Sequence, residues 1–294
     1  MATSNAVEDP EELEHARVII HRLEQGERIR DRFDRISRLP IPSNSELARD
    51  DAATAWMELS HVVMTALNMA TDNMRAVHDM LLPGDRLIVP LYAHYPVLRS
   101  ILESAVEAKW ILLPDGRPER IRRLLRARIG DANQDADLAK VERETVAGMD
   151  QPPTAADLEE QKRADDARYA KHIAKARELA LANGIEWSSV KGGLPPWIHM
   201  IREVCTVPAM PGSVRVPGGY AAGLWKIMSG LSHPSTSRSA RHSYLEPLSE
   251  SDSGVIHARL TASLRYTMEA TTVAFNTVNE AIELLEVRQF THIR

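Results

Sequence analysis

Apolar residues recur every three or four positions along most of the chain, the spacing that gives a helix one buried face. The pattern covers residues 11–38, then a longer stretch over residues 46–82. A third stretch, residues 92–113, is the most apolar of the three. Because prolines and turn residues separate these stretches, we expect three helices here.

Two highly charged helical stretches follow, and they indicate a helical hairpin over about residues 117–183, with a linker at residues 148–156. A short helix is then expected at residues 197–207. Another runs from Tyr220 to His233, where Pro234 ends it, and a polar loop rich in serine and arginine follows. The last periodic stretch, residues 252–287, predicts a long final helix.

These elements predict an all-α fold, a bundle of about five to seven main helices around one core, with the charged hairpin as an insertion. We expect residues 11–294 to form a single domain and residues 1–10 to be disordered. The chain is rich in good helix formers, and its β-branched residues are not clustered as strands would require. A length of 294 residues is enough for one large domain.

Composition excludes several classes of function. The net charge of −5 gives no global attraction to nucleic acid or anionic membranes. The single cysteine, Cys205, excludes an intrachain disulfide and a zinc site made of several cysteines. No apolar run approaches the roughly 20 residues of a membrane span, and the N-terminus is polar and acidic. We therefore expect a cytoplasmic protein that does not enter membranes.

Familiar cofactor and metal motifs are missing from the sequence. It has no phosphate-binding loop, no dinucleotide-binding glycine motif and no His-Glu-x-x-His motif. A helical di-iron protein needs two Glu-x-x-His pairs, and this chain has one, Glu12 to His15. We expect neither a metal nor a cofactor.

One basic cluster places six arginines between residues 117 and 128. It is either a solvated helix face with local acidic partners or a strip that contacts phosphate or RNA. The cluster has no interleaved aromatic residues, which weakens the second interpretation.

The most promising chemistry lies near His233. Lys226, Ser229 and His233 fall on one face of the predicted helix and combine a cation, a hydroxyl and an imidazole. His233 could act as a general acid or base, or bind phosphate, with Ser229 as its hydrogen-bond partner. The following loop adds three possible anion-binding side chains: Arg238, Arg241 and His242. The alternative is that His233 only ends a helix and the loop is solvated.

A second candidate is the pair Arg99 and Glu103, four residues apart on the most apolar helix. It is either a structural ion pair or part of a site. We expect the His233 helix to pack against this helix, so that all three side chains share a polar pocket with Trp110 as a wall.

Two segments resemble an uncharacterised bacterial all-helical family. YPVLRSILESAVEAKWILLP (95–114) resembles its Arg-Ser-x-x-Glu helix, and WKIMSGLSHPS (225–235) resembles its Ser-x-x-x-His-Pro signature. That family is distantly similar to the HEPN group, whose active members are metal-independent ribonucleases of toxin and phage-defence systems. Their motif is Arg, a polar residue and then His after four to six residues, with two motifs brought together by dimerisation. Here His233 matches the histidine, Lys226 stands at the arginine position, and Ile227 takes the polar position.

Three functions therefore compete. The resemblance implies a protein that acts on or binds RNA or a nucleotide, as a homodimer, with His233, Lys226 and Arg241 as contacts. The second is a non-catalytic helical interaction protein. The third is a helical bundle that binds a small molecule in a groove rich in methionine.

Overall fold

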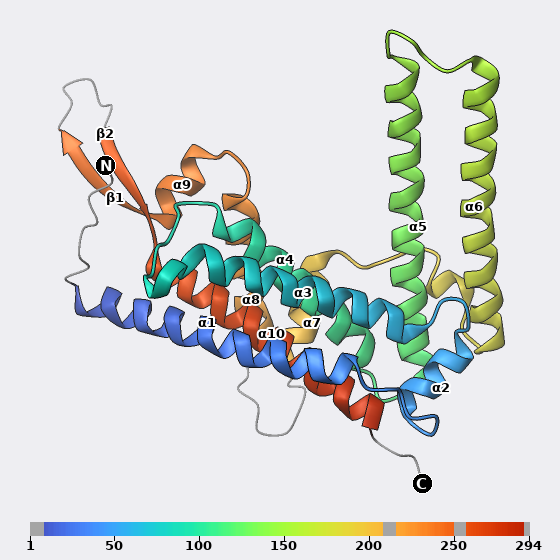
Figure 1. Ribbon diagram of the computed structural model, residues 1–294, viewed down its shortest axis with the longest axis horizontal. Coiled ribbons are helices and arrows are strands. Elements are labelled where there is room, and N and C mark those ends of the chain that lie inside the picture. The colour runs from blue at the N-terminus through green and yellow to red at the C-terminus, as the bar shows by residue number, and fades with distance from the viewer. Residues whose placement is uncertain (1–8, 208–215, 250–256, 291–294) are drawn as a thin grey trace. The chain divides into compact units, whose positions relative to one another are not determined.

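The computed structural model describes residues 9–207, 216–249 and 257–290. These contain ten α-helices and one two-stranded sheet, so the prediction of a mainly helical fold is confirmed (Figure 1). The predicted disorder of residues 1–10 falls almost wholly outside the described residues. Within the described residues, no helix has the length and apolar character needed to cross a bilayer.

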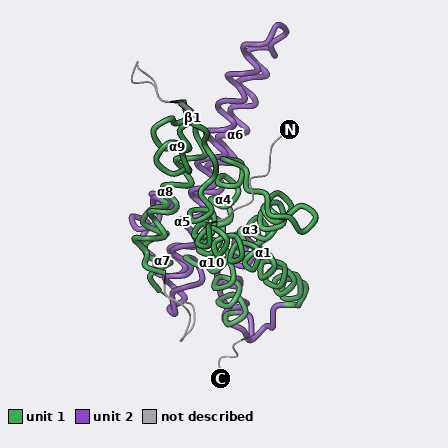
Figure 2. Tube along the Cα trace, turned by 90° about the vertical axis from the view of Figure 1, so that its left-hand side faces the viewer, with its two compact units in different colours: residues 1–40, 63–110, 197–288 green, residues 41–62, 111–196, 289–294 purple. Residues whose placement is uncertain are grey.

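The chain divides into two compact units, coloured separately in Figure 2. Unit 1 comprises residues 1–40, 63–110 and 197–288, and unit 2 comprises residues 41–62, 111–196 and 289–294. The single domain expected for residues 11–294 stays a prediction.

Unit 1 is built around long helices with apolar faces. Its helices are α1 (Pro10–Ser37), α3 (Leu59–Leu81), α4 (His94–Leu112), α7 (Trp197–Thr206), α8 (Gly218–Leu231), α9 (Thr236–His242) and α10 (Leu264–Phe290). The unit includes α3 from residue 63, α4 as far as residue 110 and α10 as far as residue 288. Polar contacts join these helices in pairs. Asn73 on α3 donates to Ser100 on α4 at 3.1 Å, and Arg32 on α1 donates through Nε to Glu286 on α10 at 3.0 Å. The core takes side chains from all four long helices, including Phe33, Leu67, Leu98, Leu102, Phe275 and Ile282.

Unit 2 holds a helix pair on a separate apolar cluster. Its helices are α2 (Glu46–Ala53), α5 (Arg117–Ala147) and α6 (Ala155–Ala182). Helices α5 and α6 lie side by side, joined by residues 148–154 (Figure 1). The cluster lies at the base of the pair and consists of Met57, Ile121, Leu125, Ile129, Ala176, Leu179, Ala180 and Val190.

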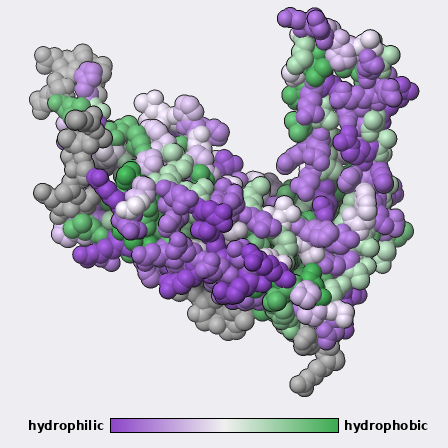
Figure 3. All heavy atoms as spheres, in the orientation of Figure 1, coloured by the Kyte–Doolittle hydropathy of each residue, from purple (hydrophilic) through white to green (hydrophobic). Residues whose placement is uncertain are grey.

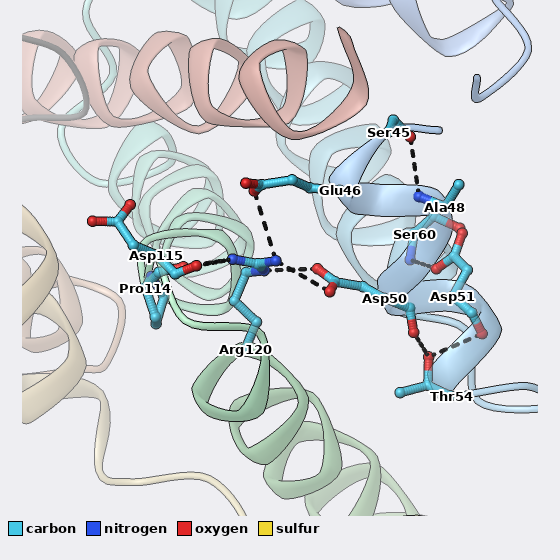
Figure 4. A network of polar contacts seen from close by, with 10 residues as sticks. All are labelled: Ser45, Glu46, Ala48, Asp50, Asp51, Thr54, Ser60, Pro114, Asp115 and Arg120. Carbon is cyan, nitrogen blue, oxygen red and sulfur yellow. Dashed lines mark hydrogen bonds and ion pairs between the residues drawn. The ribbon is translucent and has the colours of Figure 1, made fainter. Parts of the chain in front are cut away.

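Two members of the arginine run, Arg120 and Arg123, are buried in unit 2. The Nε of Arg120 donates to Asp50 at 2.6 Å, and its Nη1 donates to the carbonyls of Pro114 and Asp115 (Figure 4). Glu46 lies 3.7 Å from Nη2 of Arg120. Arg122 and Arg123 donate to Glu119. The run thus has local acidic partners, but Arg120 and Arg123 are buried rather than solvated.

The predicted continuous helix over residues 46–82 is wrong, because the chain breaks between α2 and α3. The Thr54 hydroxyl donates to the Asp50 carbonyl at 2.8 Å, and Asp51 accepts from the backbone N–H of Ser60 at 2.8 Å. Between them Trp56 takes a left-handed backbone conformation, with φ of 78°. Short polar side chains compete for backbone groups in this way, and here they override the helical periodicity.

The predicted final helix over residues 252–287 is wrong at its start. An antiparallel pair, β1 (Ser243–Ser249) and β2 (His257–Ala262), precedes α10. Tyr244 pairs with Thr261 and Leu245 with Leu260. Strand-favouring residues therefore face one another, although they are too far apart in the sequence to form one cluster. Residues 250–256 lie outside the described residues.

Candidate functional site

Helix α8 carries the predicted stripe of polar side chains and is held by close packing on α7. A Cβ atom at Gly218 would lie 2.1 Å from the carbonyl oxygen of Arg202 on α7, so only glycine fits the start of α8. Along α8, Ala221, Leu224 and Met228 are buried. This anchoring leaves the opposite face of the helix toward solvent.

The exposed face of α8 carries two of the predicted side chains, and the third follows its end. Lys226 is exposed and Ser229 is half-buried, while α8 ends at Leu231, two residues before His233. His233 is exposed, and in the described part of the chain its imidazole has neither a hydrogen-bond nor an ion-pair partner. The Ser229 hydroxyl makes no hydrogen bond to His233 there.

The predicted polar loop after His233 is wrong over residues 236–242, which form the short helix α9. Ser235 caps it by accepting from the backbone N–H of Arg238, and Ser239 donates to the Ser235 carbonyl at 2.8 Å. Serine in both roles makes a helix start that the sequence pattern did not reveal.

Arg238 and Arg241 lie one turn apart on α9, and both are exposed. The side chain of Arg238 crosses α8 at Gly230, where a Cβ atom would be 2.7 Å from its Cδ. Among the described residues, neither arginine nor Lys226 has an acidic partner. The contact at Gly230 therefore brings a cation of α9 onto α8.

The expected packing of α8 against α4, the helix of Arg99 and Glu103, is found. It is made by Trp225 on α8. Arg99 Nε and Trp225 Nε1 both donate to Glu103 Oε1 at 2.8 Å. The Arg99 guanidinium lies 5.7 Å from the Trp225 ring centroid and Lys226 Nζ lies 5.4 Å from it. Both cations are within reach of the negative ring face. Sequence reasoning missed Trp225, because its partner is 122 residues away.

The expected shared pocket is not assembled as a contact network. No hydrogen bond or ion pair joins His233 to Arg99 or Glu103 within the described residues, and the shared pocket stays a prediction. Trp110 is buried and its Nε1 donates to Glu203 at 3.2 Å. The indole that bonds Glu103 is therefore that of Trp225, not Trp110.

His242 differs from the other predicted anion contacts. Its ring lies edge-on to Tyr266, with centroids 5.3 Å apart. Burial, reinforced by the charge of Arg241, lowers the pKa of His242, so the neutral ring is favoured. It is therefore a weaker anion contact than Lys226, Arg238 or Arg241.

A buried ion pair that sequence reasoning overlooked lies in the same unit. Lys109 is fully buried, and its Nζ donates to the carbonyls of Val204 and Val207 and to Glu280 Oε2 at 2.8 Å. All three ammonium protons have acceptors. The pair therefore fixes the C-terminal end of α7 to α4 and α10, and we assign it a structural role.

The surface of α8 and α9 can thus bind an anion more readily than it can transfer a proton. A general acid or base needs a partner that orients it, and His233 has none among the described residues. Exposed lysine and arginine side chains need no such partner to contact phosphate. Comparison with family models, curated proteins and solved structures finds no match to this chain.

Proposed function

We propose that this protein binds RNA or a nucleotide through the surface formed by α8 and α9. The contacts are Lys226, Arg238 and Arg241, with His233 as a further phosphate contact. The observation that carries the proposal is that these three cations are exposed and have no acidic partner among the described residues. A cation without an internal partner is available to an external anion.

The resemblance to the HEPN group supports the same ligand class. It concerns His233 and the basic residue seven positions before it, which are two of the proposed contacts. Lys226 replaces the arginine of that motif, and lysine binds phosphate as a point charge without the paired hydrogen bonds of a guanidinium. We therefore favour binding over cleavage, and a HEPN-like ribonuclease acting as a homodimer is the second candidate.

Fluorescence anisotropy with a labelled single-stranded RNA tests the proposal. The triple variant Lys226→Ala, Arg238→Ala, Arg241→Ala removes three phosphate contacts. For wild type, log K should fall with log salt concentration with a slope of about −2, since each contact on a single strand contributes roughly 0.7. The slope for the variant should be close to zero.

A charge-matched triple variant in unit 2 controls for net charge. Lys162→Ala, Arg163→Ala, Arg177→Ala also removes three exposed cations, and it should bind RNA as wild type does. Equal affinity of wild type and both variants, or an equal loss in both, would contradict the proposal.

Degradation of total RNA by wild type and His233→Ala separates binding from cleavage. We expect no cleavage above buffer with either protein. Cleavage by wild type that His233→Ala abolishes would favour the ribonuclease candidate, and equal cleavage by both would exclude His233 as a catalyst.

A further inference from the structure

The described surface has a groove between α5 and α6 that the proposed RNA site does not use. Its volume is about 730 Å³, and every lining residue belongs to unit 2. On α5 the lining runs from Arg128 to Glu142, a rise of about 21 Å. On α6 it runs from Gln161 to His172. The groove therefore has the length of a helix of about four turns.

The two helices that form the groove bury almost nothing between them. From residue 133 to residue 175 every residue is half-buried or exposed. The pair is held by polar links instead: Tyr169 donates to Asn133 at 3.0 Å, and Arg143 pairs with Asp165. Helices normally gain most of their stability from an apolar face packed on a neighbour, and these two lack one.

Large apolar side chains nevertheless lie along the groove. Leu138 is 57% exposed and Tyr169 is 37% exposed, and both line it. At the base of the groove the ring of His172 lies 5.0 Å from that of Trp56, which is 45% exposed. In Figure 3 hydrophobic residues are scattered among hydrophilic ones along α5 and α6.

The backbone at Trp56 holds its side chain in one place. A bulky residue with φ of 78° is strained, and such strain persists where the surrounding structure over-determines the conformation. Here the strained residue presents an exposed indole beside a residue that lines the groove.

Charge indicates which partner the groove accepts. The lining has four carboxylates and two arginines, which are Asp131, Asp135, Glu142, Asp165, Arg128 and Arg168. Of the carboxylates, Asp165 is paired with Arg143 and Arg168. Asp135 and Glu142 are exposed, and neither has a cationic partner in the described part of the chain. They stand seven residues apart, on either side of Leu138. Two copies of this groove facing each other would bring like charges together, so charge disfavours a second copy of the chain as the partner.

We propose that the groove binds an amphipathic helix of another protein, with apolar side chains on its contact face and lysines or arginines beside them. Leu138, Tyr169 and Trp56 contact the apolar side chains, while Asp135 and Glu142 pair with the flanking cations. Such a third helix supplies the apolar contacts that α5 and α6 do not make with each other. This is the helix-in-groove mode of recognition.

Fluorescence anisotropy with a labelled helical peptide of about 18 leucine, alanine and lysine residues tests the proposal. We expect the full-length protein to bind it, and Asp135→Lys/Glu142→Lys to weaken binding by about tenfold or more, because two attractive contacts become repulsive. Leu138→Glu should weaken binding similarly. A peptide with glutamate in place of lysine should not bind.

Matched controls separate the groove from general charge attraction. Asp137→Lys/Glu144→Lys makes the same charge change at the same spacing on the same helix, but neither residue lines the groove. Leu181→Glu changes another exposed leucine, on α6 and outside the groove. Both controls should bind within about twofold of wild type. Circular dichroism checks that every variant keeps its helices.

Two results would overturn the proposal. One is equal weakening by the groove variants and their controls, which would mean charge attraction alone. The other is a dimer in sedimentation that excludes the peptide and is lost in Leu138→Glu, which would make a second copy the occupant.

Discussion

Single residues inside unit 1 show how burial fixes a protonation state. His94 is fully buried, and its Nε2 lies 3.0 Å from the hydroxyl of Thr267. That hydroxyl also donates to the Ser263 carbonyl at 2.9 Å, which leaves its oxygen free to accept from the His94 ring. Burial lowers the pKa of His94 from 6.5 to about 4. The ring is therefore neutral in the folded protein.

Acid should destabilise the protein through His94. Between pH 6.5 and about pH 4 the unfolded chain binds a proton at this site and the folded chain does not, so stability falls as the pH falls. The loss is about 3 kcal/mol across this range. His94→Gln removes the titration. The free energies of unfolding of wild type and variant, measured in urea, should therefore converge by that amount as the pH is lowered. Parallel pH profiles would contradict this assignment.

The buried Lys109–Glu280 pair predicts a large cost for losing one partner. Lys109→Met leaves the Glu280 carboxylate and two carbonyls without their donor, and it should lower the free energy of unfolding by about 3–5 kcal/mol. Lys162→Met, at an exposed lysine, should change it by less than about 0.5 kcal/mol. Adding Glu280→Leu to Lys109→Met should recover part of the loss. A cost below about 1 kcal/mol for Lys109→Met would mean that the pair is not needed.

At the scale of elements, helices with buried faces were predictable and their interruptions were not. The periodicity predicted α1, α4, α6 and α7 to within two residues. The break before α3 and the start of α9 depend on side chains that bond to nearby backbone groups: the Thr54 hydroxyl donates to the Asp50 carbonyl, and Asp51 and Ser235 accept from backbone N–H groups. Such bonds leave no periodic signal. The strands β1 and β2 become evident only once they pair. The stripe of Lys226 and Ser229 was visible from spacing, but the contact of Trp225 with Glu103 depends on tertiary packing.

The α5–α6 pair should open locally in the free protein. Because residues 133–175 bury no side chain, their amide hydrogens should exchange through local opening, with a free energy at least about 2 kcal/mol below that of α4. Hydrogen exchange followed by mass spectrometry measures both in one experiment. Equal protection of the pair and of α4 would show that the polar links alone hold these helices.

For the molecule as a whole, net charge is a poor guide to its ligands. The total of −5 combines a cationic surface on α8 and α9 with an acidic groove between α5 and α6. Exposed charges are largely screened beyond the Debye length of about 10 Å at 0.1 M salt, so each patch acts on a nearby partner through its own sign. The two proposals therefore concern ligands of opposite charge, and either one can fail without the other.

The boundary between the units has a practical consequence for the choice of protein fragments. Three of its five crossing points, at residues 62/63, 110/111 and 288/289, fall inside α3, α4 and α10. A fragment ending there would carry a severed helix with unsatisfied amide or carbonyl groups. Residues 148–154 are a safer place for a reporter or a protease site, since they join α5 to α6 outside any helix.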